Sequence, residues 1–119
     1  MKSKLATTIA IATVTCSVLP LQATPTAEVL KSRLRTVGYL ATSKCALSKG
    51  FISQAVVDEL IVNYANEKSQ YKTAIVWATT TTAGNSAVQA LVPYFTSDCK
   101  GLAASDEEIA DTVTPFVMQ

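Results

Sequence analysis

The chain has 119 residues, of which 49% are hydrophobic and 16% charged, with ten Lys and Arg against nine Asp and Glu. It is too apolar for intrinsic disorder and too finely interrupted for a polytopic membrane protein, and a formal charge of +1 gives no electrostatic basis for binding nucleic acid. The absence of histidine from the sequence excludes Ser-His-Asp and Cys-His catalysis, imidazole metal sites and a histidine pH switch.

Residues 1–23 have the pattern of a secretory signal peptide. Lys2 and Lys4 form a basic start, residues 5–19 are uncharged, and Ala23 is a small residue at a suitable cleavage position. As a helix the uncharged stretch would span only about 22 Å, short of a roughly 30 Å hydrocarbon core, so we favour export over a retained membrane anchor. We therefore predict cleavage after Ala23 and a single small helical domain over residues 24–119.

Cysteine usage supports this interpretation. Cys45 and Cys99 are the two cysteines of the predicted mature chain, and an even number in an exported protein indicates a disulfide. They do not form a C-x-x-C redox motif, and two thiolates without histidine make a poor zinc site. We predict a structural Cys45–Cys99 bridge. Cys16 lies in the predicted signal core, and the residues before it do not fit a lipoprotein signal.

The first predicted helix has Thr24 as its N-cap and Pro25 in its first turn, and it ends within residues 44–50, where Gly50 permits the turn. Its apolar stripe consists of Leu30, Leu34, Val37, Ala41 and Cys45. Three cations, Lys31, Arg33 and Arg35, lie mainly off this stripe. They are candidates for an anion site, although such residues more commonly form a solvated face.

The second predicted helix follows Ser53, a suitable N-cap. One face carries its apolar residues, which are Val56, Val57, Leu60, Ile61 and Tyr64, and Val62 lies on the opposite side.

Residues 71–82 form the most apolar and most ambiguous segment. Their β-branched and aromatic residues favour a strand, but they do not alternate with period two, and no partner strand is evident. As a helix, the segment places Tyr71, Ala74, Ile75, Trp77 and Ala78 on one broad side and Val76 outside it. We predict the central helix of a bundle, which ends in the threonines 79–82 with Ala83-Gly84 as its cap region.

Two more helices complete the predicted fold. Asn85 or Ser86 caps the fourth, which Pro93 kinks or ends, and residues 96–101 form a loop. The fifth begins with the Ser105–Glu108 capping box, and Ile109, Val113 and Phe116 give it an apolar side. Its acidic residues lack the spacing of a calcium loop. We thus predict an all-α bundle of about five short helices, stapled by Cys45–Cys99.

The sequence predicts an exported, non-catalytic binding or interaction protein of the periplasm, a lumen or the extracellular space, with no cofactor and no metal. The candidate apolar contact surface is Val62, Val76 and Trp77. Alternatives are a carrier of a small apolar ligand, a homodimer formed through Val62 or Val76, and a periplasmic stress chaperone. An internal cavity of roughly 300 Å³ or more would favour the carrier, and a continuous external apolar patch would favour a protein partner.

In architecture alone, the predicted chain is similar to small exported helical proteins with one disulfide, which include periplasmic acid-stress chaperones and immunity proteins that neutralise secreted toxins. A chaperone triggered by acid is one hypothesis, because protonation of the carboxylates would leave a strongly positive chain.

Overall fold

The computed structural model describes residues 24–119, so the signal peptide predicted for residues 1–23, and Cys16 within it, lie outside the described residues. From residue 24 onward the chain forms five α-helices and no strand, which confirms the all-α prediction. The helices are α3 (Ala27–Ser48), α4 (Gln54–Glu67), α5 (Ser69–Thr80), α6 (Thr82–Leu91) and α7 (Asp106–Val117), and a 3₁₀ turn, η2 (Val92–Tyr94), follows α6.

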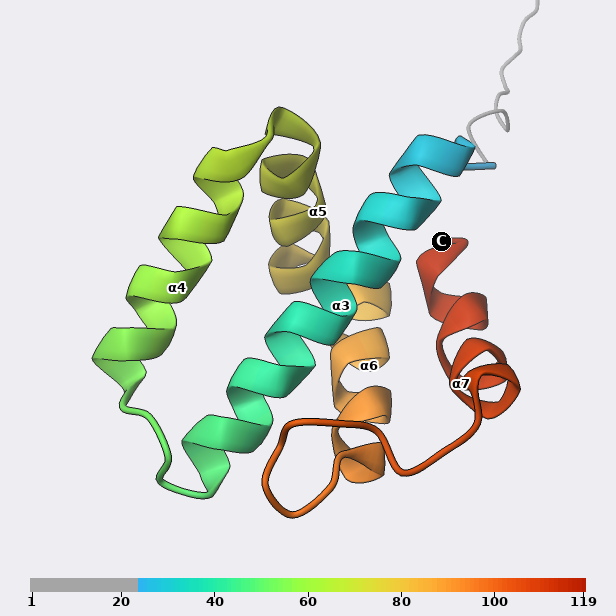
Figure 1. Cartoon of the computed structure of the whole chain (residues 1–119). Helices are drawn as coiled ribbons and strands as arrows, with labels where there is room; N and C mark the ends of the chain where they lie inside the picture. The colour runs from blue at the N-terminus through green and yellow to red at the C-terminus, as the bar shows by residue number, and fades with distance from the viewer. Residues whose placement is uncertain (1–23) are drawn as a thin grey trace, which may run out of the picture.

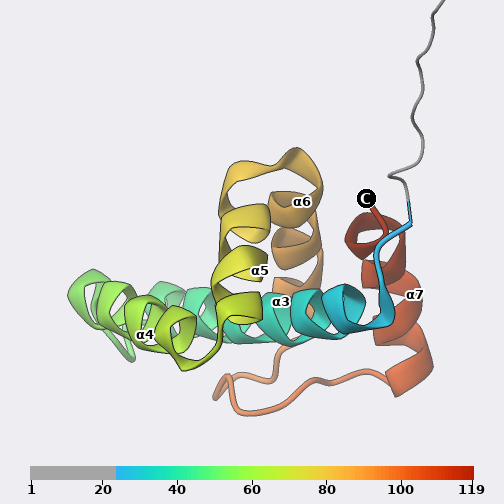
Figure 2. The same ribbon diagram turned by 90° about the horizontal axis from the view of Figure 1, so that it is seen from above.

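Helix α3 is the centre of the arrangement and contacts the four other helices. It runs diagonally across the front of the molecule, with α4 on one side, α7 on the other, and α5 and α6 behind it (Figure 1). Seen from above, α3 and α4 form one layer, and α5 and α6 rise behind them (Figure 2).

The start of α3 differs from the prediction by two residues. Thr26, not Thr24, is the N-cap, and its hydroxyl accepts a hydrogen bond of 3.2 Å from the amide of Val29. Gly50 has the left-handed backbone expected of it, with a φ of 74°. The predicted stripe is wrong at Leu34, whose side chain is 45% exposed.

The buried face of α3 includes small polar side chains that do not belong to the predicted apolar stripe. Ser32, Thr36 and Ser43 are buried because their small size allows neighbouring helices to approach closely. The hydroxyl of Ser43 donates to the carbonyl of Tyr39 at 3.1 Å, so its burial leaves the donor satisfied. Sequence periodicity weighs hydrophobic residues only, and therefore misses this side of the helix.

Helix α4 begins after Ser53 as predicted, and the Ser53 hydroxyl accepts from the amide of Val56 at 3.3 Å. Val57 and Tyr64 form its buried face, whereas Val56 is 39% exposed.

The ambiguous segment is helical, but its end was predicted two residues too late. Thr81, rather than Ala83-Gly84, separates α5 from α6, and it also replaces Asn85 and Ser86 as the N-cap of α6. Its hydroxyl donates to the carbonyl of Trp77 at 2.7 Å and accepts from the amide of Gly84 at 2.9 Å. One side chain thus satisfies backbone groups of both helices, which allows a single-residue turn.

Gly84 lies where α6 packs against the end of α5. A Cβ atom at this position would approach the carbonyl oxygen of Trp77 and would lie 2.5 Å from the Cα of Ala78. Only glycine permits this approach.

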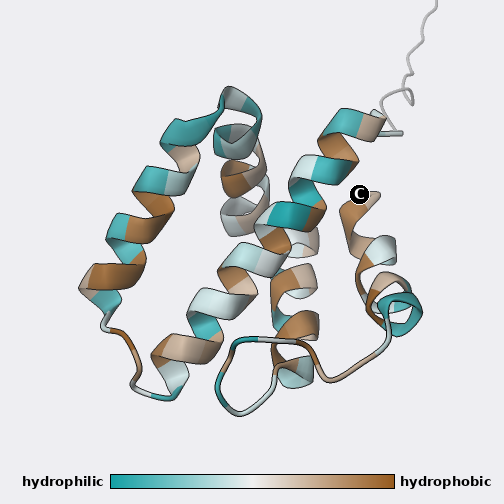
Figure 3. Ribbon diagram, in the orientation of Figure 1, coloured by the Kyte–Doolittle hydropathy of each residue, from teal (hydrophilic) through white to brown (hydrophobic). Residues whose placement is uncertain are grey.

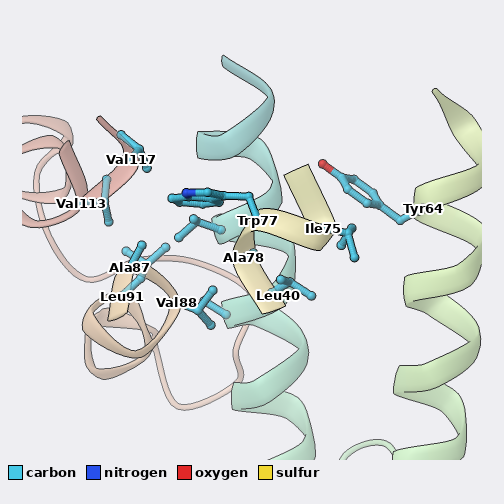
Figure 4. Packing of buried hydrophobic residues seen from close by; sticks show 12 residues of the cluster. Leu40, Tyr64, Ile75, Trp77, Ala78, Ala87, Val88, Leu91, Val113 and Val117 are labelled. Atoms are coloured by element: carbon cyan, nitrogen blue, oxygen red, sulfur yellow. The ribbon is translucent and has the colours of Figure 1, made fainter. Parts of the chain in front are cut away.

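Trp77, Ala78, Ala87, Val88 and Leu91 form the middle of the core, with Val113 and Val117 on the α7 side (Figure 4). In the hydropathy colouring, the most hydrophilic segments include the turn between α4 and α5 and the acidic start of α7 (Figure 3). At that start the Ser105 hydroxyl accepts from the amide of Glu108 at 3.1 Å, as predicted. Pro93 ends the regular part of α6, also as predicted, because η2 begins at Val92.

The predicted disulfide is present, with the Cα atoms of Cys45 and Cys99 5.8 Å apart. Cys99 has a φ of 60°, which is uncommon for a residue other than glycine. A compact turn holds it there: the Thr96 carbonyl accepts from the Cys99 amide at 2.9 Å. The Thr96 hydroxyl and the Lys100 amide donate to the Asp98 carboxylate, and together they lower the pKa of that carboxyl.

Removing the bridge will destabilise the fold strongly. The double substitution Cys45→Ala and Cys99→Ala frees a loop of 54 residues, for which the chain-entropy treatment gives a loss of about 4 kcal/mol. Urea unfolding of the variant, and of the wild type with and without a thiol reductant, measures this loss. An oxidised wild type that unfolds at the same urea concentration as its reduced form would contradict the expectation.

The two helical glycines Gly38 and Gly84 will respond to alanine in opposite directions. Gly84→Ala forces the α5–α6 contact apart and will lower stability by about 1–3 kcal/mol. Beyond the adjacent residues and backbone of its own helix, Gly38→Ala places no atom within 4 Å of the added carbon, and it will raise stability by about 0.5–1 kcal/mol. Thermal unfolding of both variants tests the close approach, which would be refuted by a Gly84→Ala protein as stable as the wild type.

Candidate functional site

A hollow of about 270 Å³, termed here the α3–α5 cleft, lies between the first turns of α3 and residues 69–77 of α5. It is partly open to solvent and mainly apolar, and it is slightly smaller than the cavity expected of an enclosed carrier. Residues from both helices line it: Val29, Ser32, Arg33, Ser69, Gln70, Thr73, Ala74 and Trp77. The cleft is therefore suited to part of a small molecule rather than to complete enclosure of one.

Arg33 connects the cleft to the end of α7. Its guanidinium carbon lies 4.5 Å from the centre of the Trp77 ring, and its Nη1 donates to the carbonyl of Val117 at 2.8 Å. Burial lowers the pKa of Arg33, but an arginine remains charged at neutral pH. The cation–π contact and the hydrogen bond hold three helices, α3, α5 and α7, in one arrangement.

Trp77 belongs to the core, being only 7% exposed. Its indole nitrogen is buried and has no hydrogen-bond partner among residues 24–119. Figure 4 shows this nitrogen on the ring edge that faces Val117. A buried donor without any hydrogen-bond acceptor destabilises a fold by about 1–3 kcal/mol.

A second hollow, of about 190 Å³, adjoins the cleft and shares Ser32 and Gln70 with it. We call it the cationic pocket, because Lys31, Arg35 and Lys68 are among its lining residues, which are completed by Glu28 and Tyr71. Lys31 and Arg35 are two of the three cations that the sequence indicated as candidates for an anion site, and the third, Arg33, lines the cleft. Lys68, contributed by the junction of α4 and α5, was not anticipated.

Three tyrosines are stacked beside the cationic pocket, and one of them, Tyr71, lines it. The ring centres of Tyr39 and Tyr64 are 4.4 Å apart, and those of Tyr64 and Tyr71 are 4.7 Å apart. The Tyr64 hydroxyl pairs with that of Thr36 at 3.0 Å, and the Tyr39 hydroxyl donates to the carbonyl of Leu60 at 3.2 Å. The stack joins α3, α4 and α5. Its members come from three different helices, so no pattern within one helix indicated it.

A third hollow of about 190 Å³ lies where α3, α4, α5 and α6 meet. Leu40, Val57, Ile61 and Val88 give it an apolar base, and Lys44, Gln54 and Asn85 are among its polar lining residues. It provides no group of cations comparable to the cationic pocket.

Only two of the three residues of the candidate apolar contact surface are exposed. Val62 is 57% exposed on α4 and Val76 is 53% exposed on α5, as their positions outside the apolar faces predicted. Trp77 does not join them, because adjacent helical residues point about 100° apart and its side chain lies in the core. The apolar surface proposed from Val62, Val76 and Trp77 therefore requires correction at Trp77.

In the described part of the chain, no group of three or more Cys, Asp or Glu side chains is placed to hold a metal ion. Among the same residues, no helix combines the length and the hydropathy needed to cross a bilayer. No protein-family model matches the sequence, and no curated protein and no solved structure is significantly similar to it.

The tyrosine stack will make stability fall at alkaline pH. Burial raises the pKa of Tyr39 and of Tyr64 above the usual value of about 10. The folded state therefore holds these protons more tightly than the unfolded state, so the stabilisation is complete below about pH 10 and is lost as the pH rises through the folded-state pKa values.

Urea unfolding at a series of pH values between about 8 and 11, with phenolate absorbance as a second signal, measures this loss. Tyr64→Phe removes one of the two groups and should lose less stability over this range than the wild type. Tyr94→Phe, which removes a phenol outside the stack, is the matched control. If Tyr64→Phe and the wild type lose equal stability over this pH range, the buried Tyr64 phenol does not contribute to the pH dependence.

Proposed function

We propose that the protein is an exported, non-catalytic binding protein that holds a small, largely apolar ligand in the α3–α5 cleft. The observation that carries this proposal is the cleft itself, an apolar hollow of about 270 Å³ in which Trp77 and Arg33 lie among polar rim residues. Small-molecule sites combine an apolar lining with a few polar groups that orient the ligand.

The packing around the cleft supports binding without a large rearrangement. Arg33 is held by Trp77 and by the carbonyl of Val117, and Thr73 donates its hydroxyl to the carbonyl of Ser69 at 3.2 Å. Side chains that are already fixed lose little freedom when a ligand arrives, which favours affinity.

The non-catalytic part of the proposal rests on composition and on the disulfide. The sequence contains no histidine, and Cys45 and Cys99 are joined to each other, so neither offers a thiolate. The bridge also indicates an oxidising environment. Export to such an environment agrees with the signal peptide predicted for residues 1–23.

The binding proposal can be tested with a neutral apolar fluorophore, N-phenyl-1-naphthylamine. Trp77 is the sole tryptophan of the sequence, so quenching of its emission reports occupation near the cleft. We expect saturable binding of one probe per chain.

Two matched substitutions locate the site. Thr73 and Thr80 are both exposed on α5, and both donate their hydroxyls to a carbonyl one turn earlier, but only Thr73 lines the cleft. Thr73→Tyr fills the cleft and should weaken binding at least about tenfold, whereas Thr80→Tyr should not change it. Non-saturable binding, or equal effects of the two substitutions, would refute the proposal.

A further inference from the structure

The charge beside the α3–α5 cleft specifies the class of ligand. We infer that the ligand is an amphipathic anion, whose apolar part occupies the cleft and whose acidic head group lies among Lys31, Arg35 and Lys68 in the cationic pocket. This inference rests on the proposed function and adds to it the charge of the ligand and the place of its head group.

The two hollows are adjacent, because Ser32 and Gln70 line both of them. A ligand that fills the cleft can therefore extend past these two side chains into the cationic pocket. Ser32 offers a hydroxyl and Gln70 an amide at the border, and both can donate to an acidic group.

The cationic pocket has an excess of positive charge. Its lining includes three cations and one carboxylate, that of Glu28, which leaves a net charge of +2. An anion placed among these side chains would relieve their mutual repulsion. A neutral head group would gain no ion pair there, and a cationic one would be repelled.

Tyr71 holds two of the cations in place. The guanidinium carbon of Arg35 and the ammonium nitrogen of Lys68 each lie 5.5 Å from the centre of its ring. Tyr71 is in turn stacked on Tyr64 at 4.7 Å. Because the ring orders both side chains before a ligand binds, less side-chain freedom is lost on binding.

The test compares octanoate with octan-1-ol, which have the same chain length and differ in the charge of the head group. Each displaces N-phenyl-1-naphthylamine from the full mature chain, and the displacement gives its affinity. At low salt we expect octanoate to bind at least about tenfold more tightly than octan-1-ol. Raising the NaCl concentration from about 20 mM to about 500 mM should remove most of this preference.

Two triple variants remove the same amount of positive charge from different places. Lys31→Gln, Arg35→Gln and Lys68→Gln together should abolish the preference for octanoate and leave octan-1-ol binding unchanged. The matched control is Lys49→Gln, Lys72→Gln and Lys100→Gln, which changes exposed lysines outside the pocket and should keep the preference.

The outcomes separate the two proposals. Equal affinity for octanoate and octan-1-ol, or loss of the preference in the control variant, overturns the inferred ligand class and leaves the proposed function standing. Failure of both compounds to displace a fluorophore that binds saturably overturns the inferred ligand class alone, whereas the absence of saturable fluorophore binding overturns both proposals.

Discussion

The Cys45–Cys99 bridge fixes the end of α3 against the loop that follows α6, and the rest of the described structure depends on this constraint. The chain between the two cysteines contains α4, α5 and α6, so these three helices are confined to one covalent loop. Within it, α3 is the common support, since it contacts each of them and α7 as well. A small core that would be marginal alone thereby gains stability through the unfolded state.

The other end of α3 is held without a covalent bond. Arg33 rests on Trp77 and binds the last turn of α7 through the carbonyl of Val117, and the tyrosine stack joins α3 to α4 and α5. The α3–α5 cleft and the cationic pocket lie at this end. The proposed binding region is therefore far along α3 from the disulfide, and directly beside the contacts that order its own side chains.

Local patterns were sufficient to predict the features that depend on a few neighbouring residues. Ser53 and Ser105 cap their helices, Gly50 permits a left-handed turn and Pro93 ends a helix, because each acts on backbone within a few residues of itself. The helical period also placed Val62 and Val76 outside. Thr24 and Thr26 are chemically equivalent as caps, however, so the choice between them could not be made from local sequence.

The features that the sequence did not reveal require tertiary contacts. The α5–α6 break at Thr81 depends on the close approach of Gly84 to Trp77, and the burial of Ser32 and Thr36 depends on helices packed against α3. The cleft combines residues about forty positions apart. Trp77 was predicted both on an apolar helix face and on a contact surface, and only packing shows that the core contains it.

The most direct test of this account is intact-mass analysis of the protein purified from its native source in the presence of a thiol-alkylating agent. We expect a chain that begins at Thr24 and carries no alkyl group on Cys45 or Cys99, and that becomes alkylated at both residues only after reduction. Alkylation of both cysteines without prior reduction would show that the bridge is absent in the native protein and would contradict the account.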